Sequence, residues 1–507
     1  MHALKGFLHR HDQRLQPRGT DAVASGVKNI FAYRKQRGVN LGAWFVLERW
    51  ITNAPFQFAE GPGQSDLDIA RGKDAKVILE SHWDTWISED DWDWLAERGI
   101  NTVRIPIGYY HICGADRTVL DGTDFFPYYD MYVGAWARII RALENAACRG
   151  IGVLLDLHAA PGKQNDDAHA GTSDRANFFN DPHNQTCTVH ALRVLVNNIV
   201  SLWGDNQPPL LNVVGVELIN EPRPPSGHAL QSWYTFAMHE LRSLDSKIPI
   251  YLGDCWRTEF YANYLVDERP SALTVLDHHL YRCFTESDIR TSAESHTLSL
   301  ADPNAETPVI LARAAEKLGR VGCGIVIGEW SGALNPGSLR GGTKEKENYV
   351  RAQLDLFEEH CGGWFFWTYK KQDRGDTGWS LRDAVQAGIF PPWVGLKAKR
   401  SPIGDEQRWR EARDGQKQRS LQLHTEYWKK LGISKHELFE VGFRDGWDDA
   451  YMFFNSQSHS TAVAELGFDR AWAYRKTKHH GKYYWEYEHG FLQGVKGARK
   501  DFEHTYC

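Results

Sequence analysis

Short apolar runs recur between residues 38 and 370, and each ends in polar or aromatic side chains. The runs are continuously apolar rather than alternating, and many of their residues are β-branched. Such runs are typical of parallel strands that are buried on both faces. We therefore predict eight strands, at 38–48, 102–109, 152–159, 213–222, 249–254, 274–281, 324–330 and 363–370.

Segments with helical spacing separate these runs. One opens with Ser88 ahead of acidic residues and closes at Gly99, and another closes at Gly150, which are helix start and stop signals. Eight strand–helix units fit a closed barrel. A doubly wound open sheet is the competing architecture, but the chain has neither G-x-G-x-x-G after the first strand nor a G-x-x-x-x-G-K-[ST] motif. The predicted fold is α/β, a (β/α)8 TIM barrel.

The amino-acid composition of the chain changes after the last predicted strand. A charged connector leads into helical, aromatic-rich sequence that mixes Tyr, Trp and His with charges. We predict an N-terminal extension at 1–30, the barrel at 31–395, and a mainly helical C-terminal extension at 396–507 that packs on the barrel. The alternative for the C-terminal extension is a separate ligand-binding or oligomerising module.

Composition narrows the functional classes. The 507 residues carry 59 Lys and Arg against 65 Asp and Glu, so no basic excess indicates a nucleic-acid partner. Mean hydropathy is −0.51 and no apolar run approaches about 18 residues, which argues against a membrane-spanning helix. The N-terminus has no apolar signal region, and the eight cysteines form no C-x-x-C pair. We expect a cytoplasmic protein, with a mitochondrial presequence as the weaker alternative, and leave the oligomeric state open.

Candidate chemistry gathers where the predicted strands end, which is the catalytic edge of a barrel. Glu221 and Glu329 are carboxylates that follow long hydrophobic runs on the fourth and seventh strands. One such residue could be a structural ion-pair partner, but two that converge on one barrel mouth favour catalysis. Cleavage of a glycosidic bond needs such a pair, one protonated and one ionised. Further polar or aromatic residues at strand ends are Glu48, Arg104, His158, Asn220, His279, Tyr281 and Trp367.

Several strings resemble glycoside hydrolase family 5, in particular its fungal exo-β-1,3-glucanase branch. NEP at 220–222 and GEW at 328–330 carry the two carboxylates. RGVNLGAWFVLERWIT at 37–52 is similar to the opening strand of that branch, and NTVRIPIGY, DLHAAPGKQN, DHHLYRCF and GGWFFWTYK are similar at four further strands. The resemblance covers roughly 37–395, and the ordered co-occurrence of these motifs makes it specific.

The resemblance implies Glu221 as acid/base and Glu329 as nucleophile of a retaining double displacement. It also implies substrate-binding or supporting roles for eight residues. In that interpretation Asn220 holds the sugar 2-hydroxyl, Arg104 and Tyr281 donate to the nucleophile, and His279 orients the sugar or the acid/base. The others are His158 and Glu48 on hydroxyls of the terminal sugar, Trp367 beneath its ring, and Phe284 beside the neighbouring subsite.

We expect no metal and no cofactor. The His278–His279 and His479–His480 doublets have no third ligand at useful spacing, and HExxH is absent. We interpret His278 as a packed core histidine whose side chain points away from that of His279.

Departures from the pattern of that branch bear on the substrate. The segment QNDDAHAG at 164–171 carries Asp167 where relatives carry an aromatic residue, Ala43 replaces a glycine, and the C-terminal extension is foreign to them. We expect a retaining β-glycosidase acting on a terminal β-glucosyl residue of a carbohydrate. The alternatives are an intracellular β-glucosidase for steryl, lipid or other small glucosides, and a non-catalytic carbohydrate-binding barrel.

Overall fold

Eight parallel strands close into a barrel in chain order, which confirms the predicted fold class. The computed structural model describes residues 19–204, 208–430, 436–456, 462–477, 481 and 483–507. Closure occurs where β1 pairs in parallel with β8, with Gln36 opposite Gly363. The strands are β1 (Gln36–Asn40), β2 (Thr102–Gly108), β3 (Gly152–Ala159), β4 (Val213–Glu217), β5 (Ile250–Gly253), β6 (Thr274–Leu280), β7 (Gly324–Trp330) and β8 (Gly363–Phe366).

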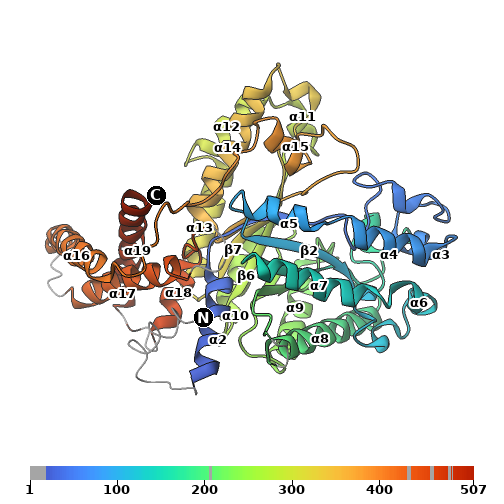
Figure 1. Ribbon diagram of the computed structural model, residues 1–507, viewed down its shortest axis with the longest axis horizontal. Helices are drawn as coiled ribbons and strands as arrows, with labels where there is room; N and C mark the ends of the chain where they lie inside the picture. Colours follow the sequence, from blue (N-terminus) through green and yellow to red (C-terminus); the bar gives the residue numbers. More distant parts are fainter. Residues whose placement is uncertain (1–18, 205–207, 431–435, 457–461, 478–480, 482) are drawn as a thin grey trace.

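Helices surround the barrel and make up the C-terminal extension (Figure 1). The predicted start at Ser88 is present: its side chain accepts a hydrogen bond from the Asp91 backbone N–H at 3.4 Å. The helices up to β8 are α2 (Gly19–Tyr33), α3 (Asp66–Arg71), α4 (Ala75–Thr85), α5 (Glu89–Ala96), α6 (Tyr129–Tyr132), α7 (Ala135–Cys148), α8 (Pro182–Gly204), α9 (Gly227–Arg242), α10 (Thr258–Glu268), α11 (Glu286–Arg290), α12 (Ala293–Ala301), α13 (Glu306–Gly319) and α14 (Thr343–His360). After β8 come α15 (Leu381–Gln386), α16 (Glu406–Lys429), α17 (Glu437–Phe454), α18 (Asp469–Lys476) and α19 (Tyr484–Tyr506), and short 3₁₀ turns include η5 (Ala168–Ala170).

Three strands end at least four residues earlier than the sequence predicts. β1 ends at Asn40 rather than at residue 48, β4 at Glu217 rather than 222, and β8 at Phe366 rather than 370. The apolar residues beyond these ends belong to buried loops at the barrel mouth, so burial there does not require ladder hydrogen bonds. Glu48 and Glu221 therefore lie on loops after strands, not on the strands themselves.

The inside of the barrel changes from apolar to polar along the strands. On β3, Leu154, Asp156 and His158 alternate and so share one face. Leu154 belongs to an apolar cluster at the N-terminal end of the barrel, whereas Asp156 and His158 hydrogen-bond to each other near its C-terminal end. Apolar side chains thus fill the N-terminal end of the barrel, and polar side chains line its C-terminal end.

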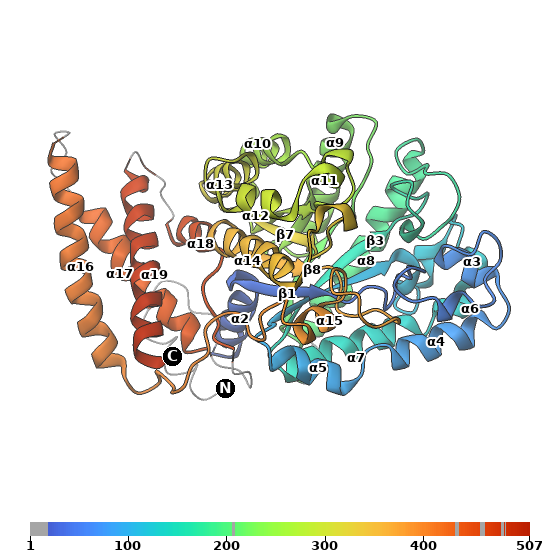
Figure 2. The ribbon, with the colours of Figure 1, turned by 90° about the horizontal axis from the view of Figure 1, so that it is seen from above.

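The C-terminal helices pack against the N-terminal end of the barrel. Figures 1 and 2 both place α16, α17 and α19 on one side of it, with α2 and α18 in between. Phe468, which precedes α18, is 4% exposed. A Cβ atom on Gly362 or Gly324 would lie 2.2 or 2.4 Å from its ring, so these two glycines admit the phenyl group. The boundaries 1–30, 31–395 and 396–507 remain predictions, and residues 1–18 lie outside the described part.

An ion-pair network joins the first strand to the extension. Arg37 on β1 contacts Glu358 of α14 and Glu465, with both N–O distances at 2.8 Å. Glu465 in turn pairs with Arg499 of α19 at 2.7 Å. Although burial opposes ionisation, the charges of Arg37 and Lys35 lower the pKa of Glu358 to about 2. The extension is therefore tied to the barrel by charge as well as by apolar contact.

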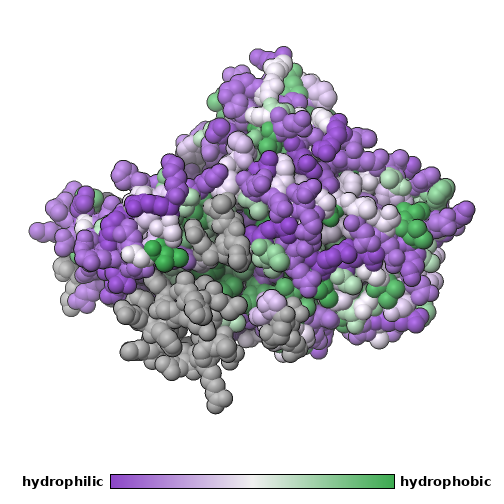
Figure 3. Space-filling model, viewed as in Figure 1, coloured by the Kyte–Doolittle hydropathy of each residue, from purple (hydrophilic) through white to green (hydrophobic). Residues whose placement is uncertain are grey.

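On the face seen in Figure 3, hydrophilic side chains cover most of the barrel and the extension. Among the described residues no helix combines the length and apolarity needed to cross a bilayer.

Replacing Phe468 with Ala tests the joint between extension and barrel. We expect the substitution to lower the free energy of unfolding by about 3–5 kcal/mol, because it leaves a cavity under Gly362 and Gly324. Urea titration of the full chain measures this. Phe236→Ala on α9, where the ring is 46% exposed, is the control and should change stability by less than about 0.5 kcal/mol. Equal losses in the two variants would contradict the packing described here.

Candidate active site

Arg104 on β2 is fully buried at the centre of the barrel mouth. Its guanidinium donates to Glu329 Oε1 at 3.0 Å, to Glu217 Oε2 at 2.8 Å, to Asn220 Oδ1 at 2.8 Å and to Asn40 Oδ1 at 2.9 Å. A planar guanidinium has donors in a fixed fork, so it can hold several acceptors in one plane. Arg104 thus fixes groups from β1, β4, β7 and the loop after β4 relative to one another.

A second chain of contacts leads from Arg104 to His158. Asp156 Oδ2 lies 3.0 Å from Arg104 Nη2 and 2.6 Å from His158 Nδ1. His158 Nε2 lies 3.4 Å from Asn220 Nδ2, and its ring stacks on that of Trp367 at 5.7 Å and 6°. Asp156 therefore sets the orientation of the imidazole, which presents its other nitrogen towards Asn220.

Glu329 closes β7 and is 5% exposed. Besides Arg104, Tyr281 donates its hydroxyl to Glu329 Oε2 at 2.8 Å. Burial raises the pKa of Glu329 above its ordinary value, although the charges of His279 and Arg104 oppose that shift. Two donors on opposite oxygens hold the carboxylate in one orientation.

Glu221 occupies a strained position after β4. Its φ of 42° is in the left-handed region, which costs a non-glycine residue energy and is common at functional sites. The side-chain amides of Gln164 and Asn165 hold this turn, since they donate to the backbone carbonyls of Asn220 and Glu221 at 3.0 Å each. The loop after β3 therefore supports the loop that carries the carboxylate.

His279 on β6 links the two carboxylates. Its Nδ1 lies 2.7 Å from Glu221 Oε1 and 3.5 Å from Glu329 Oε2. Although burial of Glu221 favours the neutral acid, the hydrogen bond and charge of His279 lower the pKa of Glu221 to about 2. Burial by itself would lower the pKa of His279. Glu329 and the other surrounding carboxylates outweigh burial and raise this pKa well above its ordinary value. The proton shared by Glu221 and His279 therefore resides on the imidazole.

One oxygen from each of Glu221 and Glu329 and one nitrogen of His279 lie within 4.8 Å of one another. Both carboxylates line a cavity of about 1350 Å³ at the mouth of the barrel. Of the residues predicted from sequence, the cavity is also lined by Glu48, His279, Tyr281, Phe284 and Trp367. Arg104, His158 and Asn220 lie directly beneath, in contact with these groups.

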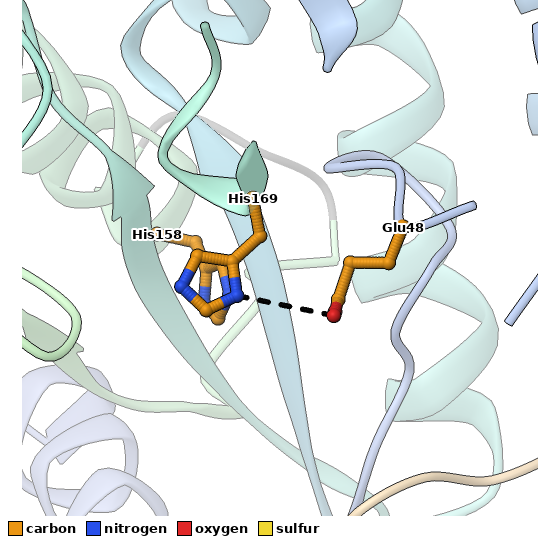
Figure 4. Close-up of side chains that lie close together, drawn as sticks. All are labelled: Glu48, His158 and His169. Atoms are coloured by element: carbon orange, nitrogen blue, oxygen red, sulfur yellow. Dashed lines mark ion pairs between the residues drawn. The ribbon is translucent and has the colours of Figure 1, made fainter. Parts of the chain in front are cut away.

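His169 belongs to the site but was not among the predicted residues. It lies on η5 beside Glu48 and His158, as Figure 4 shows. Its Nδ1 is 3.8 Å from Glu48 Oε2 and its Nε2 is 3.9 Å from Glu221 Oε2. Despite burial, these carboxylates raise the pKa of His169 to about 9. The sequence signal that could have indicated His169 is its position in QNDDAHAG, two residues after Asp167, which stands where relatives carry an aromatic residue.

Aromatic rings form one wall of the cavity. Phe284 is 69% exposed and meets Tyr281 edge-on at 5.5 Å. The Trp379 ring contacts those of Tyr281, Phe284 and Trp50. Trp50 also donates a hydrogen bond from Nε1 to Glu48 Oε2 at 2.7 Å. Trp50 and Trp379 were not predicted, because each follows a strand by a loop of irregular length.

The interpretation of His278 as a packed core residue is wrong. Its side chain is 13% exposed and lines the same cavity as Glu221, and its Nδ1 lies 2.7 Å from Asp254 Oδ2. The side chain does point away from that of His279, which stays on the face of Asp277 with a His279 Nε2 to Asp277 Oδ2 distance of 3.8 Å. The doublet His479–His480 lies outside the described residues.

Comparison with known families and proteins agrees with this geometry. The family described as Cellulase (glycosyl hydrolase family 5) matches residues 70–373, and the family described as Glucan 1,3-beta-glucosidase 3 C-terminal domain matches 409–503. The chain is 32% identical to Glucan 1,3-beta-glucosidase 3 of Schizosaccharomyces pombe, over 91% of this chain and 95% of that protein. It is 29% identical to a probable glucan 1,3-beta-glucosidase A of Aspergillus clavatus, over 70% of this chain and 87% of that one.

A solved structure shows the same fold at lower identity. The rutinosidase from Aspergillus niger superimposes with a TM-score of 0.57 at 18% identity, over 71% of this chain and 99% of that one. The chain belongs to glycoside hydrolase family 5 and is a glycoside hydrolase. The resemblance drawn from the sequence motifs is thereby confirmed.

Replacing His169 with Gln tests its place in the site. Below pH 9 the imidazole is cationic, so it stabilises ionised Glu48 as a hydrogen-bond acceptor in the cavity. We expect KM for a glucoside to rise about tenfold with a smaller change in kcat, the cost of one charge-assisted contact. The difference should shrink as pH rises through about 9. His183→Gln, at an exposed position on α8, is the control, and an unchanged KM in His169→Gln would contradict the assignment.

Proposed function

We propose that this glycoside hydrolase removes a terminal β-glucosyl residue from a β-1,3-linked glucan by retaining double displacement, with Glu329 as nucleophile and Glu221 as acid/base. One observation carries the proposal: oxygens of the two carboxylates lie within 4.8 Å inside a single cavity. Retaining enzymes place the two carboxyl groups about 5–5.5 Å apart, whereas inverting enzymes need about 6.5–9.5 Å to admit a water molecule.

In the first step Glu329 attacks the anomeric carbon. Its carboxylate oxygen forms an ester bond to that carbon while the glycosidic C–O bond breaks, and the leaving oxygen takes a proton from Glu221. Arg104 and Tyr281, on opposite oxygens of Glu329, support its ionised form before attack. Arg104 thus opposes the rise in the pKa of Glu329 that burial causes, and so helps to keep the nucleophile ionised.

In the second step water replaces the leaving group. Glu221, now ionised, takes a proton from the water, whose oxygen attacks the anomeric carbon and releases Glu329 as a carboxylate. The sugar keeps its β configuration because the anomeric carbon is inverted twice.

His279 supplies the proton store that this cycle needs. It holds the proton in its 2.7 Å hydrogen bond to Glu221. A bound sugar displaces water from the cavity and removes the solvation that stabilises separated charges, which favours transfer to Glu221. The neutral acid is the form that protonates the leaving oxygen.

The remaining residues bind the sugar in this proposal. Asn220, held by Arg104, takes the 2-hydroxyl, and Glu48 and His158 take other hydroxyls of the same ring. Trp367 lies beneath the ring, and the exposed Phe284 stacks on the next unit of the substrate.

The names of the relatives favour β-1,3-glucan as the substrate. Two of them, from Schizosaccharomyces pombe and Aspergillus clavatus, are named glucan 1,3-beta-glucosidases, and the C-terminal extension matches a domain named after such an enzyme. The exposed Phe284 beside Trp379 offers a stacking surface for a second sugar. The cytoplasmic location expected from the sequence stays a prediction.

A small glucoside is the second candidate substrate class. Asp167 is half-exposed at the cavity rim and lies 3.7 Å from Arg223, so this side of the mouth is charged rather than aromatic. A glucan chain would therefore meet an aromatic wall on one side of the mouth and charged groups on the other, which favours a smaller substrate.

A substrate panel separates the two candidates. We expect kcat/KM for laminaribiose and laminaritriose to exceed that for octyl and steryl β-glucosides by at least about fivefold, since stacking of one sugar contributes about 1 kcal/mol or more. Quantifying released glucose measures this. Faster turnover of the small glucosides would transfer the assignment to the second class.

Glu329→Ala tests the nucleophile. We expect kcat on an aryl β-glucoside to fall by about 10⁴-fold or more, since no group remains to form the ester. Added azide should restore turnover and give the α-glucosyl azide, identified by NMR. The control is Glu306→Ala, a carboxylate that lines the same cavity on α13. Unchanged turnover in Glu329→Ala would remove it as nucleophile.

Glu221→Ala tests the acid. A good leaving group departs without a proton, so the loss of kcat/KM should be at least about 100-fold smaller for a dinitrophenyl glucoside than for an alkyl glucoside. Azide in this variant should give the β-glucosyl azide. Equal losses on the two substrates would contradict an acid role.

A further inference from the structure

The C-terminal extension contains a buried cluster of two histidines and one carboxylate. His424 comes from α16, His436 directly precedes α17, and Glu486 belongs to the first turn of α19. Their exposed fractions are 5%, 8% and 2%. The three side chains therefore meet between three helices, well away from the barrel mouth, in the part of the chain left of the barrel in Figure 2.

The cluster has the geometry of a ligand set. Glu486 Oε1 lies 2.9 Å from His436 Nδ1 and 3.6 Å from His424 Nε2. One potential ligand atom from each residue lies within 4.8 Å of the other two. Ligands of a tetrahedral zinc ion, at bond lengths of about 2.0–2.2 Å, are roughly 3.3 Å apart. The two observed distances bracket that value.

The imidazole nitrogens lack other partners. Among the described residues, neither ring nitrogen of His424 nor Nε2 of His436 has a hydrogen-bond partner. Buried polar atoms are almost always paired, so the unpaired His424 Nε2, which lies 3.6 Å from Glu486 Oε1, needs an explanation.

Packing fixes the histidine rings. The His424 ring stacks on Phe439 at 4.1 Å and 16° and meets the His436 ring edge-on at 4.8 Å. His489, one turn after Glu486 on α19, has its ring centre 5.2 Å from that of His424. The ligand atoms are thus held in place by neighbouring side chains rather than by solvent-exposed loops.

We propose that His424, His436 and Glu486 bind a zinc ion that joins α16, α17 and α19. Imidazole nitrogen and carboxylate oxygen suit zinc, whereas calcium and magnesium prefer oxygen ligands alone. One carboxylate and two neutral imidazoles leave a net positive site, which a water or hydroxide in the fourth position completes. The site is separate from the catalytic cavity, because none of its residues lines the cavity of Glu221 and Glu329.

This inference differs from the expectation of no metal. That expectation considered histidine doublets and HExxH spacing, whereas these ligands come from three separate helices with no common spacing. Only their arrangement in space brings them together.

Zinc titration of the full chain tests the site. Protein without a histidine tag, stripped with a chelator and desalted, is titrated with zinc chloride by calorimetry and then with cobalt(II) in a spectrophotometer. We expect one zinc with a Kd below about 1 μM, a higher unfolding temperature, and visible cobalt bands typical of four-coordinate geometry. A Kd of the wild-type protein for zinc above about 1 μM would overturn the proposal.

Two variants and a control assign the binding to this cluster. His424→Phe preserves ring stacking on Phe439, and Glu486→Gln preserves shape, and each should weaken zinc binding at least 100-fold. His504→Ala, an exposed histidine on the same helix α19, should bind as the wild type does. Zinc bound instead by the catalytic carboxylates would persist in both variants, and that result would contradict the assignment. Circular dichroism verifies that each variant is folded before titration.

Discussion

The site depends on one buried cation. Arg104 has no contact with solvent, yet its charge-assisted hydrogen bonds reach Glu329, Glu217 and Asn220 on neighbouring parts of the barrel. Burying a guanidinium is costly unless acceptors surround it, so folding of the mouth and placement of these acceptors are a single event. Burial raises the pKa of Glu217 well above its ordinary value despite the charge of Arg104. Glu329, the proposed nucleophile, is therefore positioned by the same contact that makes the buried charge tolerable.

Two imidazoles lie between the carboxylates of the cavity. His279 lies between Glu221 and Glu329, and His169 lies between Glu221 and Glu48. Each cation reduces the repulsion between the acidic groups on either side of it. Glu48, Glu221 and Glu329 can therefore lie close together in one cavity. Because the cations come from β6 and from the loop after β3, a change in either element alters the proton balance without touching the reacting atoms.

Much of the fold could be predicted because parallel strands buried on both faces leave a continuous apolar signature. The ends of β1 and β4 could not, since the buried loops carrying Glu48 and Glu221 are as apolar as the strands. Glu221 and Glu329 could be named as candidates because each carboxylate follows such a run within a recognisable motif. His169 was missed because its role depends on three elements meeting in space, and the cavity position of His278 was missed because its partner Asp254 lies on the separate loop after β5.

Trapping the covalent intermediate tests the central claim most directly. Incubation with 2,4-dinitrophenyl 2-deoxy-2-fluoro-β-glucoside slows both steps but preserves a good leaving group, so the glycosyl ester accumulates. Proteolysis and mass spectrometry then locate the sugar. The account predicts stoichiometric labelling of Glu329 and none of Glu221. Labelling of another residue, or turnover with inversion and no trapped ester, would contradict a retaining site built around Arg104 and Glu329.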